Sequence, residues 1–393
     1  MHSYYEFFAG GGMARAGLGE DWRCLFANDI DAAKAACYGA NWGEAGLAVK
    51  CVGDLSPAEI PGRADLAWAS FPCQDLSLAG GCAGLRGERS GTFWLFWRLM
   101  EKLAEEGRAP ELIVLENVCG ALTSHDGADF AAICGALADC GYRFGALAID
   151  AVHFLPQSRP RLFVIAVRVG LDAAKPFESL VEKFGDRSEE VERGGGRLWR
   201  SATLLAAHAK LPKRLQEAWI WWRLPIPPQR TASLEGILEA DPEGVAWNTP
   251  EQTLRLQSMM SPLHRRKVEL AARAQRRVAG AVYRRTRRDK KGRPLQRAEV
   301  RFDGVAGCLR TPAGGSSRQT ILIVEGGSVR SRLLSPREAA RLMGLPESYR
   351  LPENYNQAYH LAGDGVAVPV VRFLAAHLLE PLLAASGRNK DAA

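Results

Sequence analysis

Short apolar runs alternate with amphipathic segments through the first 170 residues of the chain. Several of these runs are continuous rather than alternating, which is typical of strands covered on both faces. Seven runs predict strands, at residues 4–8, 24–27, 48–52, 64–70, 112–115, 144–149 and 162–167. Helical spacing between them predicts helices at residues 31–38, 92–105 and 129–139. This order predicts an α/β fold with a doubly wound, mostly parallel sheet.

The alternation of strands and helices stops near residue 174, and this change predicts a domain boundary. The first domain comprises residues 1–173, and residues 174–350, rich in Gly, Pro, Arg and Trp, predict a second, smaller and irregular domain. The sequence Ser-Pro-Arg-Glu predicts a helix over residues 335–346 at the junction, with serine as N-cap and proline at the first helical position. Residues 351–385, of which 365–383 are strongly apolar, are expected to return to the first domain. Residues 386–393 are expected to form a disordered tail.

Positive charge is concentrated in one segment of the second domain. The whole chain of 393 residues carries a net charge of +7. Residues 265–301 contain 15 Lys or Arg and three acidic residues, a net of +12, so the remainder is near −5. Such a cluster is typical of a surface that binds a polyanion such as nucleic acid. A solvated charged loop is the alternative that composition alone leaves open.

The cysteines and the apolar runs indicate the compartment. Nine cysteines, an odd number in a long chain, have no paired framework and are expected to be reduced thiols. Cys134 and Cys140 lack a second pair at zinc-ligand spacing, so no metal site is predicted. No apolar run reaches the roughly 18 residues of a membrane span, and the N-terminus lacks the pattern of a signal peptide. We therefore expect a cytoplasmic protein that does not bind a membrane.

A glycine-rich turn follows the first predicted strand. Residues 8–12, Phe-Ala-Gly-Gly-Gly, lead into a helical pattern, and glycine there lets the backbone approach a ligand closely. The next two strands end at Asp29 and Asp54, where carboxylates can bind the hydroxyl groups of a nucleoside. The turn contains no Lys or Arg, which disfavours phosphate binding. A plain tight turn is the alternative, but the two carboxylates favour a nucleoside cofactor.

Reactive side chains follow at the same edge of the predicted sheet. Cys73 comes after the fourth strand and Glu116 after the fifth, while Arg159 and Arg161 precede a later strand. Ligands of doubly wound sheets bind where these strands end, so the thiol and the carboxyl group can face each other beside the cofactor. Nearby arginines favour the thiolate form of a cysteine. A buried, structural cysteine is the common alternative.

In their order along the chain, the motifs FAGGG, FPCQ, GLRGERSGTFW, ENV, QSRPR, SPREAARLMGLP and GDGV resemble those of the DNA (cytosine-5) methyltransferase family. The resemblance covers the whole chain except about residues 175–330. It implies a Rossmann-like methyltransferase domain, a smaller target-recognition domain, S-adenosylmethionine as cofactor and C5 of a cytosine in double-stranded DNA as methyl acceptor. It implies Cys73 as the nucleophile, Glu116 as the contact to N3 and the exocyclic amine of the base, and Arg161 as the contact to O2. Arg159 is expected to belong to the same catalytic group.

The resemblance also implies where the cofactor binds. Phe8 is implied to stack near the adenine, Asp29 to bind the ribose, and Asp54 to bind the adenine amino group. The full set of expected cofactor contacts is Phe8, Ala9, Gly10, Gly12, Asp29, Ile30, Asp54, Leu55, Pro72, Asp364 and Val366.

DNA contacts are expected in three parts of the chain. The glycine-rich loop after Cys73 can move when the target cytosine leaves the base stack. Arginines of the basic segment are too crowded for each to read a base, so most are expected to contact phosphates. Residues 308–319 mix glycine with Arg and Gln, which pair with guanine and adenine. The expected contacts are Gln74, Ser77, Arg86, Arg89, Arg284, Arg285, Arg287, Arg288, Arg310, Arg318 and Gln319.

Two other functions remain open from the sequence. A tRNA cytosine methyltransferase shares the same core, but the long basic second domain favours duplex DNA. A catalytically silent DNA-binding protein on the same scaffold is disfavoured because all four expected catalytic residues are present. A dinucleotide oxidoreductase fits the glycine spacing poorly. A cognate restriction endonuclease acting on the same site is a candidate partner, and we expect a monomer, because one molecule can methylate each strand in turn.

Overall fold

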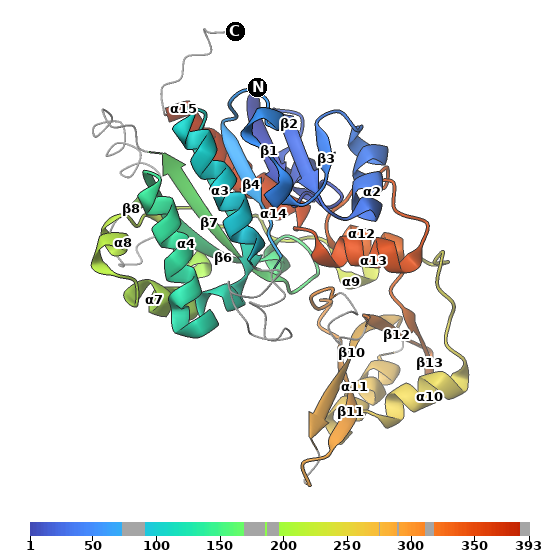
Figure 1. The fold of residues 1–393 in the computed structure, drawn as a ribbon. Helices are drawn as coiled ribbons and strands as arrows, with labels where there is room; N and C mark the ends of the chain where they lie inside the picture. The colour runs from blue at the N-terminus through green and yellow to red at the C-terminus, as the bar shows by residue number, and fades with distance from the viewer. Residues whose placement is uncertain are drawn as a thin grey trace. The chain divides into compact units, whose positions relative to one another are not determined.

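The structure, a computed structural model, describes residues 1–72, 91–168, 185–186, 196–274, 276–288, 291–310 and 318–385. The chain divides into two compact units (Figure 1). The first unit comprises Met1–Asp150, Pro160–Pro227 and the segment from Val366 onward, and the second comprises Ala151–Arg159 and Pro228–Gly365. The predicted tail at residues 386–393 lies outside the described residues.

The first unit contains a seven-stranded sheet in the order β3-β2-β1-β4-β5-β7-β6. The pairs among the first five strands in this order are parallel, whereas β7 runs antiparallel to both β5 and β6. The mostly parallel α/β fold is therefore confirmed. Each predicted strand overlaps an observed one, although the bounds differ by a few residues. The strands are β1 (His2–Phe7), β2 (Trp22–Asp29), β3 (Leu47–Val49), β4 (Leu66–Ala69), β5 (Leu112–Val118), β6 (Tyr142–Asp150) and β7 (Pro160–Arg168).

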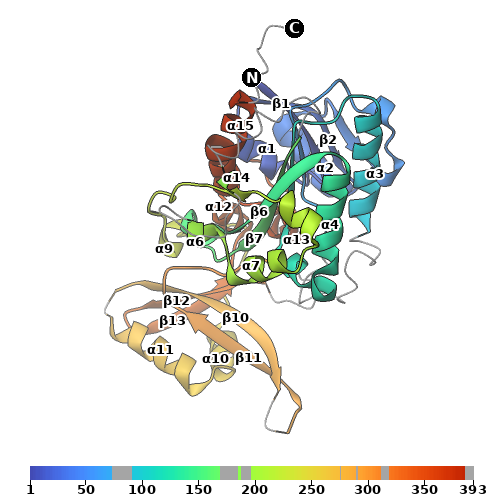
Figure 2. The same cartoon turned by 90° about the vertical axis from the view of Figure 1, so that its left-hand side faces the viewer.

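Helices cover both faces of this sheet, with α3 and α4 on one side and α1, α14 and α15 on the other (Figures 1 and 2). Helix α3 begins and ends at the predicted residues. Its aromatic residues recur at helical spacing, so that Phe93, Phe96 and Trp97 are buried together. The helices of the first unit are α1 (Met13–Leu18), α2 (Ala32–Trp42), α3 (Thr92–Glu105), α4 (Ala128–Asp139), α6 (Gly196–Trp199), α7 (Ala202–Ala209), α8 (Lys213–Glu217), α14 (Val368–Leu374) and α15 (Glu380–Ala385).

Residues 196–227 belong to the first unit, although their composition placed them in the second domain. The segment runs along β6, where the Ile220 N–H donates to the Phe144 carbonyl at 2.7 Å. Gly145 permits this approach, since a Cβ at that position would lie 1.8 Å from the Ile220 carbonyl oxygen. Trp219 and Trp221 are buried in the same core. Trp221 belongs to β9 (Trp221–Trp222), which pairs with β8 (Gly185–Asp186). The tryptophans therefore extend the core of the first unit.

The second unit contains a four-stranded antiparallel sheet in the order β11-β10-β12-β13. Its core lies between this sheet and helices α10 and α11, and includes Leu256, Val268, Val282, Val300 and Leu322. Residues 351–365, expected in the first domain, belong to this unit, where α13 packs on α12. The elements are α9 (Leu234–Ile237), α10 (Pro250–Ser258), α11 (Pro262–Arg273), β10 (Val278–Arg288), β11 (Pro294–Arg301), β12 (Thr320–Glu325), β13 (Ser328–Leu333), α12 (Pro336–Leu342) and α13 (Tyr355–Asp364).

Helix α12 starts as its sequence predicts. The Ser335 hydroxyl accepts from the Glu338 N–H, and the Glu338 carboxylate accepts from the Ser335 N–H at 2.8 Å. The helix ends at Leu342, four residues before the predicted boundary at 346. Glu338 also binds the buried Arg332 guanidinium through both carboxylate oxygens, each at 2.7 Å. The capping box and this ion pair together fix α12 to β13.

Among the described residues, one segment, Tyr355–Ala385, has the length and apolar composition of a membrane span, contrary to the sequence reading. Its most apolar window has a mean hydropathy of 1.6 and is 61% buried. The segment is broken where α13 ends at Asp364 and Gly365 turns extended, with ψ of 172°. Core helices of water-soluble proteins show the same composition, so this segment is weak evidence for a membrane span.

Candidate active site

The strand ends of the first unit converge at one edge of the seven-stranded sheet. Strands β1, β2, β4 and β5 run in parallel, so their carboxyl ends lie at the same edge. Strand β7 is antiparallel to β5 and therefore begins at this edge, with Arg161 paired opposite Val118. The sequence segments that carry the candidate chemistry are thus brought together by the topology, as expected for ligand sites of doubly wound sheets.

Glu116 and Arg161 form an ion pair at this edge. The Arg161 Nε lies 3.2 Å from a carboxylate oxygen of Glu116, and the two side chains are 15% and 7% exposed. Water screens such a shielded pair less than it screens a surface pair. The guanidinium therefore holds the carboxyl group in a fixed orientation beside the end of β5.

Asn117 links the end of β5 to the segment that leads to Cys73. Its Nδ2 donates to the Phe71 carbonyl at 3.3 Å, and its Oδ1 accepts from the Val118 N–H at 2.8 Å. Asn117 is buried, a position where an amide is retained only when it is hydrogen-bonded. Sequence reasoning missed this residue, although it stands inside the ENV motif. Cys73 itself and the expected DNA contacts Gln74, Ser77, Arg86 and Arg89 lie outside the described residues.

A second thiol, Cys119, follows β5 directly. Burial raises the pKa of this thiol, and the nearby Glu116 and Asp150 carboxylates raise it further, whereas Arg161 lowers it. The thiol is therefore protonated at neutral pH. Because thiolates, not thiols, are the nucleophiles, burial makes Cys119 a poor candidate for a nucleophile.

The glycine-rich turn between β1 and α1 has a strained backbone. Phe8 has a φ of 56°, one of three non-glycine residues with positive φ among those described. Gly10 and Gly12 also have positive φ, and a Cβ on Gly12 would lie 2.4 Å from the Trp42 indole. Non-glycine residues in this region are uncommon and cluster at functional sites. The Phe8 ring packs against Phe96 of α3 at 6.4 Å between ring centroids.

Asp29 holds the turn in place. Its two carboxylate oxygens accept from the Gly10 N–H at 2.7 Å and the Asp31 N–H at 2.8 Å. Each carboxylate oxygen has two lone pairs, so these bonds leave acceptor capacity for a ribose hydroxyl. Ala9 is fixed in the same way, since its N–H donates to the Asn28 carbonyl at 2.9 Å.

Three further cofactor candidates are Ile30, Asp54 and Leu55. Ile30 is 69% exposed, and it follows the carboxylate directly in the sequence. Asp54 is exposed but ends a short 3-10 helix, Val52–Asp54, rather than the third strand, which stops at Val49. Leu55, next to it, is buried. The pairing of β3 stops at Val49, which lies opposite Asp29, the last residue of β2.

Arg159 is buried among backbone carbonyl groups of the second unit. It belongs to the second unit and is 1% exposed. Its guanidinium donates to the carbonyls of Leu309, Gly363 and Gly365, at 3.3, 2.9 and 2.6 Å. A buried arginine needs several acceptors, and these backbone carbonyls supply them. The described contacts hold Arg159 against the GDGV motif, and its catalytic role stays a prediction.

The two expected cofactor residues near the C-terminus lie on either side of a unit boundary. Asp364 ends α13 in the second unit, flanked by the two carbonyls that Arg159 holds. Val366 begins the last segment of the first unit and is buried, 4% exposed. Pro72, the last described residue before Cys73, is half-buried.

The expected DNA contacts of the second unit fall into two groups. Arg284, Arg285, Arg287 and Arg288 are exposed on β10, as a phosphate-binding surface requires, and Arg310 is exposed on a loop. Arg318 donates to Asn356 and lies over the Tyr355 ring at 5.5 Å, and is half-buried.

Gln319 contradicts the prediction that it reads a base. It is 3% exposed, and its Nε2 donates to the Val282 and Thr320 carbonyls at 2.9 and 3.1 Å. Its backbone N–H donates to the Tyr359 hydroxyl at 2.9 Å. The side chain therefore joins β12 to β10 inside the unit and cannot contact DNA.

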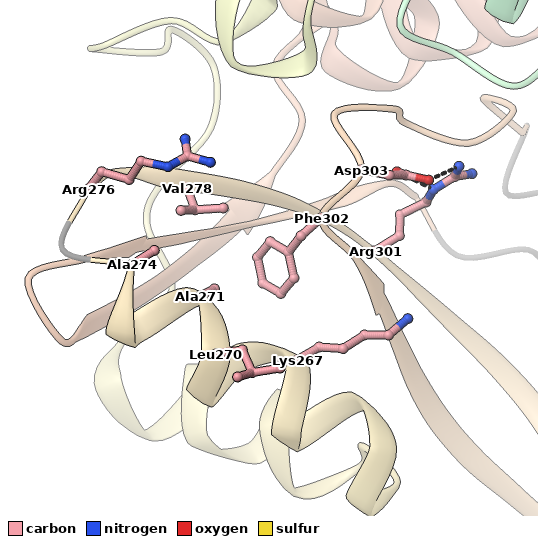
Figure 3. A pocket seen from close by; sticks show the side chains of 9 residues that line it. All are labelled: Lys267, Leu270, Ala271, Ala274, Arg276, Val278, Arg301, Phe302 and Asp303. Atoms are coloured by element: carbon pink, nitrogen blue, oxygen red, sulfur yellow. Dashed lines mark hydrogen bonds and ion pairs between the residues drawn. The ribbon is translucent and has the colours of Figure 1, made fainter.

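A cavity of about 480 Å³ in the second unit is lined by none of these residues (Figure 3). It opens between α11 and strands β10 and β11, with the Phe302 ring directed toward α11. Arg301 at its rim donates to Asp303 at 2.8 Å, so part of the local positive charge is neutralised. None of its lining residues belongs to the expected catalytic or cofactor-binding sets, and we assign it no part in the chemistry.

The sequence of this chain matches the C-5 cytosine-specific DNA methylase family over residues 3–380. It is 27% identical to the Type II methyltransferase M.NlaX of Neisseria lactamica, over 99% of this chain and 100% of that protein. It is 26% identical to M.BsuFI of Bacillus subtilis (98% and 74%) and 24% identical to M.HhaI of Haemophilus parahaemolyticus (95% and 92%).

Solved structures show the same fold. The Dnmt2 methyltransferase of S. pombe matches with a TM-score of 0.53 at 17% identity, over 97% of this chain and 99% of that one. The Entamoeba histolytica methyltransferase EhMeth matches with a TM-score of 0.62 at 13% identity, over 97% and 99%. The match over nearly the whole sequence, together with the Glu116–Arg161 pair at the strand ends, identifies this chain as a member of the C-5 cytosine-specific DNA methylase family.

Proposed function

We propose that this protein transfers a methyl group from S-adenosylmethionine to C5 of a cytosine in a specific duplex DNA site, through a covalent adduct with Cys73. The observation that carries the proposal is the pairing of Glu116 with Arg161 at the edge of the sheet where the segment to Cys73 also emerges. The family match supports the DNA substrate and the reaction class.

The chemistry requires a nucleophile and an acid on the same base. C5 of cytosine is a weak nucleophile, and addition of the Cys73 thiolate to C6 converts the ring to an enamine in which C5 is electron-rich. Negative charge develops at N3 during this addition, and a proton or hydrogen bond from Glu116 stabilises it. After methyl transfer, a base removes the C5 proton, and the thiolate leaves C6 as the double bond re-forms.

Arg161 contacts both the Glu116 carboxyl group and the target base in this step. Its guanidinium orients the Glu116 carboxyl group at 3.2 Å and has further donors for the O2 atom of the base. Burial of the pair limits rotation of the carboxyl group, so little reorganisation is needed when the base arrives.

The residues at the glycine turn fit S-adenosylmethionine. Exposed Ile30 and the Phe8 ring offer apolar surfaces to the adenine, while Asp29 offers acceptor capacity to the ribose and Asp54 an exposed carboxylate to the amino group. The bound cofactor supplies an electrophilic sulfonium methyl group for C5. We assign Leu55, Pro72 and Val366 to the same site, Leu55 and Val366 as its apolar walls.

A cytosine inside a duplex cannot reach the strand ends, so the base must leave the stack. We propose that the loop after Cys73 fills or supports the vacated position through Gln74, Ser77, Arg86 and Arg89. The basic second unit holds the flanking duplex. We propose that the modified site is one that a cognate restriction endonuclease cuts, and that the enzyme acts as a cytoplasmic monomer.

The test is transfer of label from S-adenosylmethionine to duplex DNA, single-stranded DNA or tRNA by the full chain. We expect labelled 5-methylcytosine in duplex DNA at one sequence, located by bisulfite sequencing. Label in tRNA alone would identify a tRNA methyltransferase on the same core. DNA binding without label in any substrate would identify a catalytically silent protein.

A further inference from the structure

Strands β10 and β11 extend as a two-stranded ribbon beyond the rest of their sheet. Strand β12 pairs only with residues 278–282 of β10, whereas β10 and β11 pair with each other as far as Arg288 and Pro294. The part beyond β12 is about 15–20 Å long at the usual rise per residue. Figure 1 shows the two strands running past β12 and β13. A two-stranded ribbon of this kind fits the major groove of duplex DNA.

The register divides the ribbon side chains between two faces. Thr286 lies directly opposite Gln296, and alternate residues share a face, so Arg284 and Arg288 lie on the face of this pair. Arg285 and Arg287 lie on the other face, together with Glu299. Thr286, Gln296 and all four arginines are exposed.

The two faces differ in chemistry. Glu299 accepts from Arg287 Nη2 at 2.7 Å and lies 3.4 Å from Arg285 Nε, so its carboxylate neutralises part of that face. A carboxylate there also repels phosphates. On the opposite face, the described ribbon residues from 284 to 288 and from 294 to 298 include no acidic side chain. The face of Thr286 and Gln296 is therefore the better match for DNA.

Gln296 is held in a defined orientation at the centre of that face. Its Nε2 donates one hydrogen to the Thr286 hydroxyl at 2.8 Å. The second Nε2 hydrogen and the Oε1 atom are the donor and acceptor that a glutamine uses to bind N7 and N6 of adenine together. A side chain already ordered by a neighbour loses less conformational entropy when it binds.

We propose that Gln296 reads an adenine in the major groove of the target site, that Thr286 positions its amide, and that Arg284 and Arg288 contact the flanking phosphates from the same face. The inference rests on the proposed function, because the ribbon reads a base only if the chain acts on duplex DNA. It adds a residue for sequence choice that the pattern of the basic segment did not single out.

The experiment uses the purified full chain, S-adenosylmethionine and a duplex library randomised around the methylated site, with bisulfite sequencing as readout. Gln296→Ala relaxes preference at one position where the wild type prefers an A·T pair, by about 5- to 150-fold, the value of a bidentate base contact. Thr286→Val relaxes the same position less, and Thr286→Ser restores it. Arg285→Ala with Arg287→Ala, the matched change on the other face, keeps preference at that position.

A binding titration over salt concentration tests the arginines. Arg284→Ala with Arg288→Ala reduces the magnitude of the slope of log affinity against log salt by about 1.8, or ~0.9 per phosphate contact. Unchanged preference in Gln296→Ala, relaxation at a G·C pair, or a wild-type site without A·T pairs would overturn the proposal for Gln296 while leaving the methyltransferase function standing. A wild-type chain that methylates no duplex would instead refute the proposed function. Because the changed residues are exposed, thermal unfolding is expected to match the wild type, which confirms that each variant is folded.

Discussion

The Nε of Arg161 lies 3.2 Å from a carboxylate oxygen of Glu116, although the two residues are 45 positions apart in the sequence and stand on antiparallel strands. The antiparallel entry of β7 is what makes this possible, because it places the beginning of one strand beside the end of another. A substitution that keeps the positive charge of Arg161 but changes its shape should therefore alter the orientation of the Glu116 carboxyl group.

Glu116→Gln tests the acid. The amide can donate a hydrogen bond to N3 but cannot transfer a proton, so we expect the chemical step to slow by about 10²- to 10⁴-fold. Single-turnover methylation measures this step, and cofactor affinity should change little. A purely structural Glu116 would instead lower thermal stability and leave the rate per folded molecule intact.

Cys73→Ser tests the nucleophile, with Cys119→Ser as a matched control. Duplex DNA with 5-fluorocytosine at the target should trap the wild-type protein covalently, since fluorine cannot leave as a proton does. Cys73→Ser should abolish trapping and methyl transfer, because a serine hydroxyl is hardly ionised at neutral pH. Cys119→Ser should still be trapped, since burial raises the pKa of that thiol and keeps it protonated. Trapping of the Cys73 variant on a denaturing gel would refute the mechanism.

Strand positions were predictable where burial dictated the sequence. The central strands are covered on both faces, so each reads as a continuous apolar run, and β4 is buried at all four positions. Helix α3 and the start of α12 followed in the same way from apolar spacing and from a capping box. The carboxyl-end location of Glu116 and Asp29 then followed from the order of the strands.

The remainder depended on tertiary contacts that leave no local pattern. Gln319 stands in a stretch of turn-forming and polar residues, yet it is buried because β12 begins there and pairs with β10. Residues 196–227 resemble the second domain in composition, yet Gly145 allows them to run along β6. A single glycine inside a strand was the one signal that could have indicated this approach.

Arg159→Lys and Arg161→Lys should have opposite effects, which separates a clamp from a catalytic group. Lysine cannot reach the three carbonyls that Arg159 binds, and each buried carbonyl left without a donor costs about 1–3 kcal/mol. We therefore expect Arg159→Lys to lower the melting temperature and weaken cofactor binding through the displaced GDGV segment, with single-turnover rate at saturating cofactor preserved. Arg161→Lys should lower that rate with little change in melting temperature. A rate loss in Arg159→Lys at full cofactor saturation would instead support a catalytic role for Arg159.

Glu6, on β1 beneath the glycine turn, offers a test by pH. Burial raises the pKa of its carboxyl group from 4.5 to about 8, although the N–H groups of Arg15 and Ala14 favour the charged form. One carboxyl oxygen and the neighbouring Tyr4 hydroxyl have no hydrogen-bond partner among the described residues. The group is therefore protonated in the folded protein at pH 7 and ionised in the unfolded chain.

Glu6 should consequently make the protein less stable as pH rises. Below the unfolded value of 4.5 both states are protonated and nothing is lost, whereas between 4.5 and about 8 folding requires uptake of a proton. Over that range the free energy of unfolding falls by at most about 1.4 kcal/mol per pH unit on account of this group. Glu6→Gln cannot ionise, so its stability relative to the wild type should increase from pH 5 to pH 8 and then level off. Urea unfolding at intervals of one pH unit measures the difference, and parallel stability curves for the two proteins would show that Glu6 is ionised in the folded state.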